Sequence, residues 1–241
     1  MGRIVAIGGG DLDTTHKINK YIVGMTEKKN PNMLFVGTAS HDAEGYISAI
    51  KNEFEGLGCT VNALRLLTEK YTDEAIDNIM NQADIIYVGG GDTSFMMEIW
   101  KKHRIDIRLK QIYRNKQTVL AGLSAGAICW FSLGHSDSSC FEKDGHVGYG
   151  WVNGLLELHS YAFCPHYNER REIVDRMISD APIPCIALDN NVAFVEQDGN
   201  VFFITSDISA KAYVIKNDDD SLNKQEQKAT AIINRSFSGC C

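Results

Sequence analysis

The segment TVLAGLSAGAICWF, residues 118–131, joins a short apolar run to a glycine–serine turn and then to helix-forming residues. Gly122, Ser124 and Gly126 are spaced as G-x-S-x-G, the pattern of a nucleophile elbow, in which a serine stands on a tight strand-to-helix turn. The alternative is a serine that caps a helix in an ordinary strand-to-helix connection. The apolar run before the motif and the helix-forming residues after it favour the nucleophile.

Apolar runs of strand length lie on both sides of this motif, and segments with helical spacing separate several of them. The runs are residues 3–8, 33–37, 59–64 and 84–88 before the motif, and 158–163, 184–190 and 211–216 after it. This alternation predicts an α/β fold in three layers, a mostly parallel sheet with helices on both faces. Residues 191–205 predict a C-terminal β-hairpin that turns at Asp198-Gly199. Because right-handed crossovers place the strand-to-helix loops at one edge of a parallel sheet, we expect the functional site at that edge.

Length and composition limit the classes of protein that the chain can be. Its 241 residues, of which 44% are hydrophobic, suit a single domain over 1–241 with a polar tail from about residue 217. The net charge of −7, without a basic stripe, argues against a nucleic-acid partner, and no apolar run is long enough to cross a membrane. Seven scattered cysteines without a CxxC pair indicate reduced thiols and a cytoplasmic protein, and they lack the spacing of metal ligands. No cofactor is expected, and the role of Cys240-Cys241 is left open.

A serine nucleophile needs a base, because its free hydroxyl is almost never ionised at neutral pH. His166 ends a predicted strand at the same sheet edge as Ser124, so it is the preferred base; the alternative is a surface imidazole. A carboxylate should orient the imidazole. The chain between the two residues offers Asp137, Glu142 and Asp144, of which Asp137 is preferred because it follows the elbow most closely.

An acyl-transfer enzyme also needs N–H donors for the oxyanion. The N–H of Ala125 directly follows the serine, and the glycine-rich segment VGGGDT, residues 88–93, can expose further N–H groups at the same edge. The alternatives for the glycine-rich segment are phosphate binding or a plain tight turn. No Lys-Ser or Lys-Thr pair follows it, which disfavours a nucleotide.

The motifs GLSAGAICWF, YVGGGDT and CPHY, together with their relative positions, resemble the dipeptidase E family of serine peptidases, peptidase family S51, over roughly residues 3–215. The resemblance implies a fold like that of the class I glutamine amidotransferases, with serine in place of cysteine. It implies that Ser124 is the nucleophile, His166 the base and Asp137 the acid of a catalytic triad. It also implies that Gly91 and Ala125 donate the N–H groups that bind the oxyanion.

Two features of the sequence bear on the substrate. The aspartyl dipeptidases of this family have Asn after the three glycines, whereas this chain has Asp92, whose charge would repel an acidic substrate residue unless it is paired or turned away. The family uses an Arg beyond the catalytic His to hold the acidic side chain, and Arg170 and Arg171 are the candidates here. The alternative interpretation of Arg170 and Arg171 is that they lie on a solvent-exposed face of a helix. We therefore expect a small-peptide hydrolase without strict specificity for Asp.

The leading hypothesis is a serine exopeptidase that hydrolyses small peptides through an acyl-enzyme. The first alternative is an esterase or amidase on the same scaffold. The second is a non-catalytic binding protein that keeps the fold. The expected partner is a small peptide, and a homodimer is compatible with the sequence.

Overall fold

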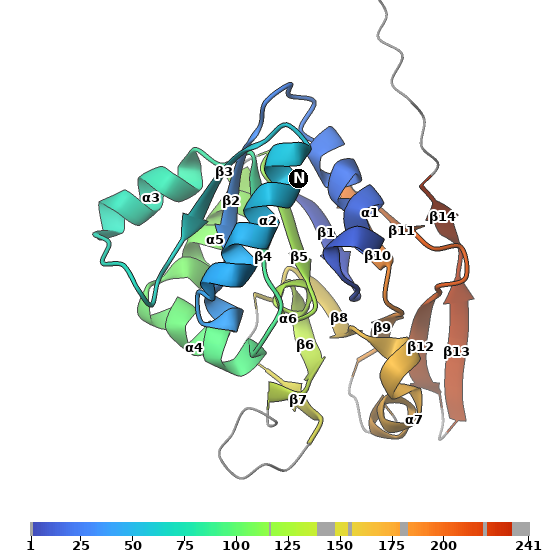
Figure 1. Ribbon diagram of the computed structural model, residues 1–241. Helices are drawn as coiled ribbons and strands as arrows, with labels where there is room; N and C mark the ends of the chain where they lie inside the picture. Colours follow the sequence, from blue (N-terminus) through green and yellow to red (C-terminus); the bar gives the residue numbers. More distant parts are fainter. Residues whose placement is uncertain are drawn as a thin grey trace, which may run out of the picture.

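The computed structural model describes residues 2–115, 117–138, 148–153, 156–178, 183–218 and 221–232. The strands of these residues form two sheets (Figure 1). The first has eight strands in the order β14-β11-β10-β1-β5-β4-β2-β3, and the second has six in the order β13-β12-β9-β8-β6-β7. No helix in the described ranges is both long and apolar enough to cross a membrane.

The first sheet contains the strands that lead to the elbow. Its members are β1 (Arg3–Ile7), β2 (Asn32–Val36), β3 (Thr60–Leu64), β4 (Ile85–Val88), β5 (Val119–Leu123), β10 (Val192–Gln197), β11 (Asn200–Thr205) and β14 (Ala229–Ala231). The five strands β1 to β5 run parallel to one another, whereas β10 runs antiparallel to both β1 and β11. The predicted parallel sheet and the predicted hairpin are therefore confirmed.

Helices cover both faces of this sheet, as the uninterrupted apolar strands indicate. They are α1 (Leu12–Gly24), α2 (Glu44–Gly56), α3 (Asp73–Asn81), α4 (Thr93–Lys102) and α5 (Ile105–Asn115). Alternate residues of β1 point to opposite faces of the sheet. Val5 and Ile7 belong to the core under α1 and α2. Ile4 and Ala6 belong to the core under α3, α4 and α5. Figure 1 shows α1 and α2 together on one side of the sheet. The three-layer α/β fold is confirmed.

The second sheet carries its own helix. Its strands are β6 (Phe131–Ser136), β7 (Gly150–Val152), β8 (His159–Cys164), β9 (Cys185–Leu188), β12 (Ala212–Asp218) and β13 (Ser221–Gln227), and the helix is α7 (Tyr167–Ile178). Tyr167, Val174 and Ile178 of α7 are buried against residues of β8, β9 and β12. Because β6, β8 and β9 are mutually parallel neighbours, their carboxyl ends meet at one edge.

The structure corrects several local expectations. The helix after Ser124 is a single turn, α6 (Ala125–Ile128), and β6 already begins at Phe131. Residues 221–227 of the expected polar tail form β13, whose backbone pairs with β12 regardless of its polar side chains.

Candidate active site

Ser124 stands on a strained turn between β5 and α6. Its backbone has φ 55° and ψ −114°, a conformation that few L-residues adopt. Only glycine fits at the two flanking positions. A Cβ on Gly122 would lie 2.1 Å from the carbonyl oxygen of Gly126, and a Cβ on Gly126 would lie 2.1 Å from that of Val88. The G-x-S-x-G spacing is thus a packing requirement of the turn.

The Ser124 side chain makes no cap hydrogen bond to α6. Its Oγ lies 2.6 Å from Nε2 of His166, a residue 42 positions further along the chain, between β8 and α7. The structure therefore brings together the two side chains that the sequence paired, and it favours the nucleophile over the helix cap. The distance is within the range for an O–H···N hydrogen bond from serine to imidazole.

The other imidazole nitrogen, Nδ1 of His166, lies 2.9 Å from Oδ1 of Asn190, just after β9. An amide oxygen is only an acceptor, so Nδ1 carries the proton and donates it to this contact. Nε2 is then free to accept the Ser124 hydroxyl proton. A general base needs this tautomer.

Asp137 does not occupy the place that the sequence assigned to it. It follows β6, and no hydrogen bond joins it to His166 among the described residues; its negative charge raises the pKa of His166, but as the smallest of the causes. The contact with Nδ1 of His166 is made by Asn190 instead. Asp137 and Asn190 follow β6 and β9, the two strands that flank β8, and of these two residues Asn190 makes the contact with the imidazole. The other candidate acid, Asp144, lies outside the described residues.

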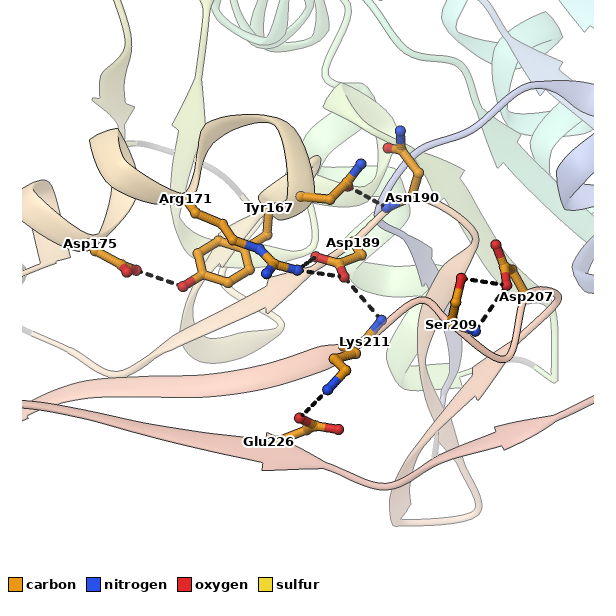
Figure 2. A network of polar contacts seen from close by, with 10 residues as sticks. Tyr167, Arg171, Asp175, Asp189, Asn190, Asp207, Ser209, Lys211 and Glu226 are labelled. Atoms are coloured by element: carbon orange, nitrogen blue, oxygen red, sulfur yellow. Dashed lines mark hydrogen bonds and ion pairs between the residues drawn. The ribbon is translucent and has the colours of Figure 1, made fainter.

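A polar network fixes the turn that carries Asn190. The Asp189 carboxylate accepts hydrogen bonds from Nη2 of Arg171, at 3.0 and 3.2 Å, and from the Lys211 N–H, at 3.1 Å. The Asn190 N–H donates to Oδ1 of Asn168 at 2.9 Å. Figure 2 shows the Asn190 side chain directed away from the Arg171–Asp189 pair. The Arg171 guanidinium therefore pairs with Asp189 and stabilises this turn.

Arg170, the other candidate cation, is placed differently. It interrupts α7 with a non-helical φ of −134°, and it is only 6% exposed. Its guanidinium carbon lies 4.8 Å from the centre of the Tyr149 ring, and its Nε and Nη1 have no hydrogen-bond partner in the described part of the chain. Its positive charge contributes to lowering the pKa of both His166 and His135. Within the described residues, Arg170 is thus a buried cation with two unpartnered nitrogens, and its charge acts on the imidazole.

The electrostatic surroundings keep His166 neutral. Burial is the largest cause that lowers its pKa below the usual value, and the charge of Arg170 is the second. The hydrogen bond to Asn190 and the charges of Glu169 and Asp137 oppose that shift. The net pKa is lowered, so the imidazole is unprotonated near neutral pH and ready to accept a proton.

The glycine-rich loop after β4 packs against the elbow. A Cβ on Gly90 would lie 3.4 Å from Cβ of Ser124, and Gly91, with φ +137°, approaches the Ala39 carbonyl so closely that a Cβ there would lie 2.2 Å from it. Asp92 caps α4, because its Oδ1 accepts the Phe95 N–H at 3.1 Å. The Asp92 carboxylate is therefore paired with the helix N-terminus. Among the described residues, no cluster of three or more His, Cys, Asp or Glu could hold a metal ion.

Comparison with known proteins agrees with this arrangement. The uncharacterised peptidase YgaJ of Bacillus subtilis is 31% identical over 223 residues, covering 88% of this chain and 91% of YgaJ. The uncharacterised peptidase Lmo0363 of Listeria monocytogenes is 27% identical over 157 residues, covering 61% and 71% of the two chains. A peptidase from an acI-B1 Actinobacterium has the same fold, with a TM-score of 0.67 at 17% identity and 95% coverage of both chains. So does a putative peptidase E protein from Listeria monocytogenes EGD-e, with a TM-score of 0.65 at 21% identity and coverage of 85% and 98%.

The 31% identity with YgaJ over 88% of this chain places the protein among the peptidases. A family model then places it within that class: the model of peptidase family S51 matches residues 4–204, and the chain belongs to this family. The resemblance that the three motifs indicated is confirmed.

Proposed function

We propose that this peptidase is a serine-type exopeptidase that hydrolyses small peptides through an acyl-enzyme. The observation that carries the proposal is the 2.6 Å contact between Ser124 Oγ and His166 Nε2. Ser124 attacks the scissile carbonyl while His166 takes its proton, and His166 then returns that proton to the leaving amine. Water then attacks the acyl-enzyme: His166 takes a proton from the water and returns it to Ser124 Oγ, which leaves as the hydroxyl.

Three further groups complete the proposed machinery. Asn190 holds the imidazole through its 2.9 Å contact with Nδ1, the role that the sequence assigned to Asp137. The N–H groups of Gly91 and Ala125 bind the oxyanion, which is supported by the packing of the glycine loop against Ser124. A preorganised pair of donors of this kind stabilises the charge that develops on the carbonyl oxygen.

Arg170 is the group that we propose for substrate recognition. Its Nε and Nη1, which have no partner among the described residues, and its burial suit a carboxylate of the substrate, since a buried guanidinium binds an anion strongly. Arg171 is paired with Asp189, which supports a structural role. The Asp92 carboxylate is occupied by the Phe95 N–H, so its charge does not exclude an acidic substrate. The substrate is thus a small peptide with an acidic group near the scissile bond.

The setting of the enzyme is also a proposal. Four described cysteines, Cys59, Cys129, Cys164 and Cys185, are free and buried, which supports a reducing compartment and a cytoplasmic location. The peptide is the expected partner, and a homodimer is compatible with the fold.

An active-site phosphonate tests the proposal. It should label Ser124 alone, and Ser124→Ala should lose the label and at least about a thousandfold of kcat/KM on a panel of dipeptides. Ser209→Ala, at an exposed serine, is the matched control and should change neither. A panel of acyl esters run in parallel separates a peptidase from an esterase. Full dipeptide hydrolysis by Ser124→Ala would overturn the proposal.

A further inference from the structure

The amide of Asn190 connects His166 to a carboxylate. Oδ1 of Asn190 lies 2.9 Å from His166 Nδ1, and Nδ2 of the same amide donates to Oε1 of Glu169 at 2.5 Å. We propose that Glu169 is a positioning residue, which acts through Asn190 on the His166 imidazole. The inference rests on the proposed function, because it presupposes that His166 is the general base.

The first argument concerns the orientation of the amide. An asparagine side chain has an acceptor end and a donor end of nearly equal shape. A carboxylate can only accept, so Glu169 holds Nδ2 on its own side and leaves Oδ1 facing His166. The reverse orientation would present an N–H to Nδ1 and move the imidazole proton to Nε2. That tautomer cannot accept the proton of Ser124.

The second argument concerns charge. An imidazolium forms on His166 during the reaction, and a neutral amide stabilises it less than an aspartate would. The charged groups that act on His166 are the cation of Arg170 and the anions of Glu169 and Asp137. Two hydrogen bonds of the Asn190 amide connect Glu169 to Nδ1 of His166, and hydrogen bonds in such a chain polarise one another. Glu169 thus supplies through Asn190 part of the stabilisation that an aspartate would supply directly.

The third argument concerns how the chain builds this contact. His166, Asn168 and Glu169 lie at the start of α7, and each of them contacts a different group of Asn190: Oδ1, the backbone N–H and Nδ2, respectively. Three residues at or just before the start of α7 therefore make hydrogen bonds with Asn190. Loss of the Glu169 contact leaves the other two in place, so its removal should not displace the turn.

The decisive experiment compares Glu169→Gln in two backgrounds. In the wild-type background we expect kcat to fall about tenfold, with KM little changed. The acid limb of the pH profile should also move to lower pH, since the loss of an anion lowers the pKa of His166. Glu172→Gln, on an exposed position of the same helix, removes the same charge and should change neither.

The second background is Asn190→Asp, which puts a carboxylate directly at Nδ1 and beside Glu169. Here Glu169→Gln removes a like-charge contact instead of a bridge, so it should cost less than about twofold or raise kcat. An equal fall of kcat in both backgrounds, or no change of kcat and acid limb in the wild-type background, overturns the inference. If Asn190→Asp is inactive, the wild-type background decides alone. Phosphonate labelling of wild-type Ser124 keeps the outcomes distinct, because failure of the proposed function would abolish it.

Discussion

His166 and Asn190 are 24 residues apart in the chain, yet their side chains meet at 2.9 Å. They follow β8 and β9, neighbouring parallel strands of the second sheet whose carboxyl ends share an edge. Gly9, which follows β1 of the first sheet, reaches the same point. A Cβ on Gly9 would lie 2.1 Å from Oδ1 of Asn190 and 2.3 Å from Nδ1 of His166. The candidate site therefore lies where the two sheets meet.

Gly9→Ala should disable the site, because the added methyl group would force His166 and Asn190 apart. We expect kcat/KM to fall about 100-fold, the cost of a displacement of about 1 Å in a catalytic group. Gly45→Ala, in α2, is the control: its Cβ would meet nothing within 4 Å, and activity should stay at the wild-type level. Steady-state kinetics with thermal unfolding of both variants checks this. Wild-type activity of Gly9→Ala would contradict the geometry.

The pH dependence of hydrolysis should reflect the surroundings of His166. The base works only when it is neutral, so kcat/KM rises as pH increases through the pKa of the free enzyme. Burial and the Arg170 cation lower that pKa, and the midpoint of the acid limb should therefore lie below about 6.5, the usual value for histidine. A pH–rate profile on a dipeptide without titrating groups in this range measures it. A midpoint above that value would show that the anions near His166 dominate.

Arg170 and Arg171 should respond differently to the same substitution. Arg170→Gln should raise KM for an acidic dipeptide about tenfold or more, because a charge-assisted hydrogen bond is lost. It should also move the acid limb upward, since removal of a cation raises the pKa of His166. Arg171→Gln should leave this KM almost unchanged and cost about 1 kcal/mol or less of stability, because the Arg171 side chain is 45% exposed. Equal changes of KM in the two variants would remove Arg170 from substrate recognition.

His135 should make the protein sensitive to acid. Neither ring nitrogen has a hydrogen-bond partner in the described part of the chain, and burial, followed by the charge of Arg170, lowers the pKa of His135 to about 4. The unfolded chain binds a proton below about pH 6.5 and the folded one only below about 4, so stability falls between these values by up to about 3 kcal/mol.

His135→Phe keeps the ring contacts with Tyr149 and Trp151 and removes the titrating group. Urea unfolding at pH 7 and pH 4.5 should therefore show a smaller loss of stability in this variant. His16→Gln, at an exposed histidine, should leave the wild-type loss in place. The same loss in His135→Phe would mean that other groups cause it.

The local sequence pattern was sufficient to predict those elements whose own residues show their burial. Apart from Arg3 and Asn32 at their first positions, the strands β1, β2, β4 and β5 are apolar because helices cover both faces, so composition alone predicts them. β13 lacks such a signal: its sequence SLNKQEQ is polar and mostly exposed, and its pairing with β12 uses backbone groups. The one-turn α6 has a similar cause, since Phe131 enters β6, a strand defined by its pairing with β7 and β8.

The sequence by itself determined the elbow and its pairing with a histidine. The G-x-S-x-G spacing is visible in residues 122–126 alone, and His166 directly follows a strand that its own residues predict. Only the tertiary structure decided the remaining roles. Asn190 rather than Asp137 contacts the imidazole, although both follow strands that neighbour β8. The guanidinium of Arg170, at the kink of α7, is buried, whereas that of Arg171 pairs with Asp189. The order of the strands and the side of a helix that is buried depend on contacts between residues far apart in the chain, so no local pattern of residues encodes them.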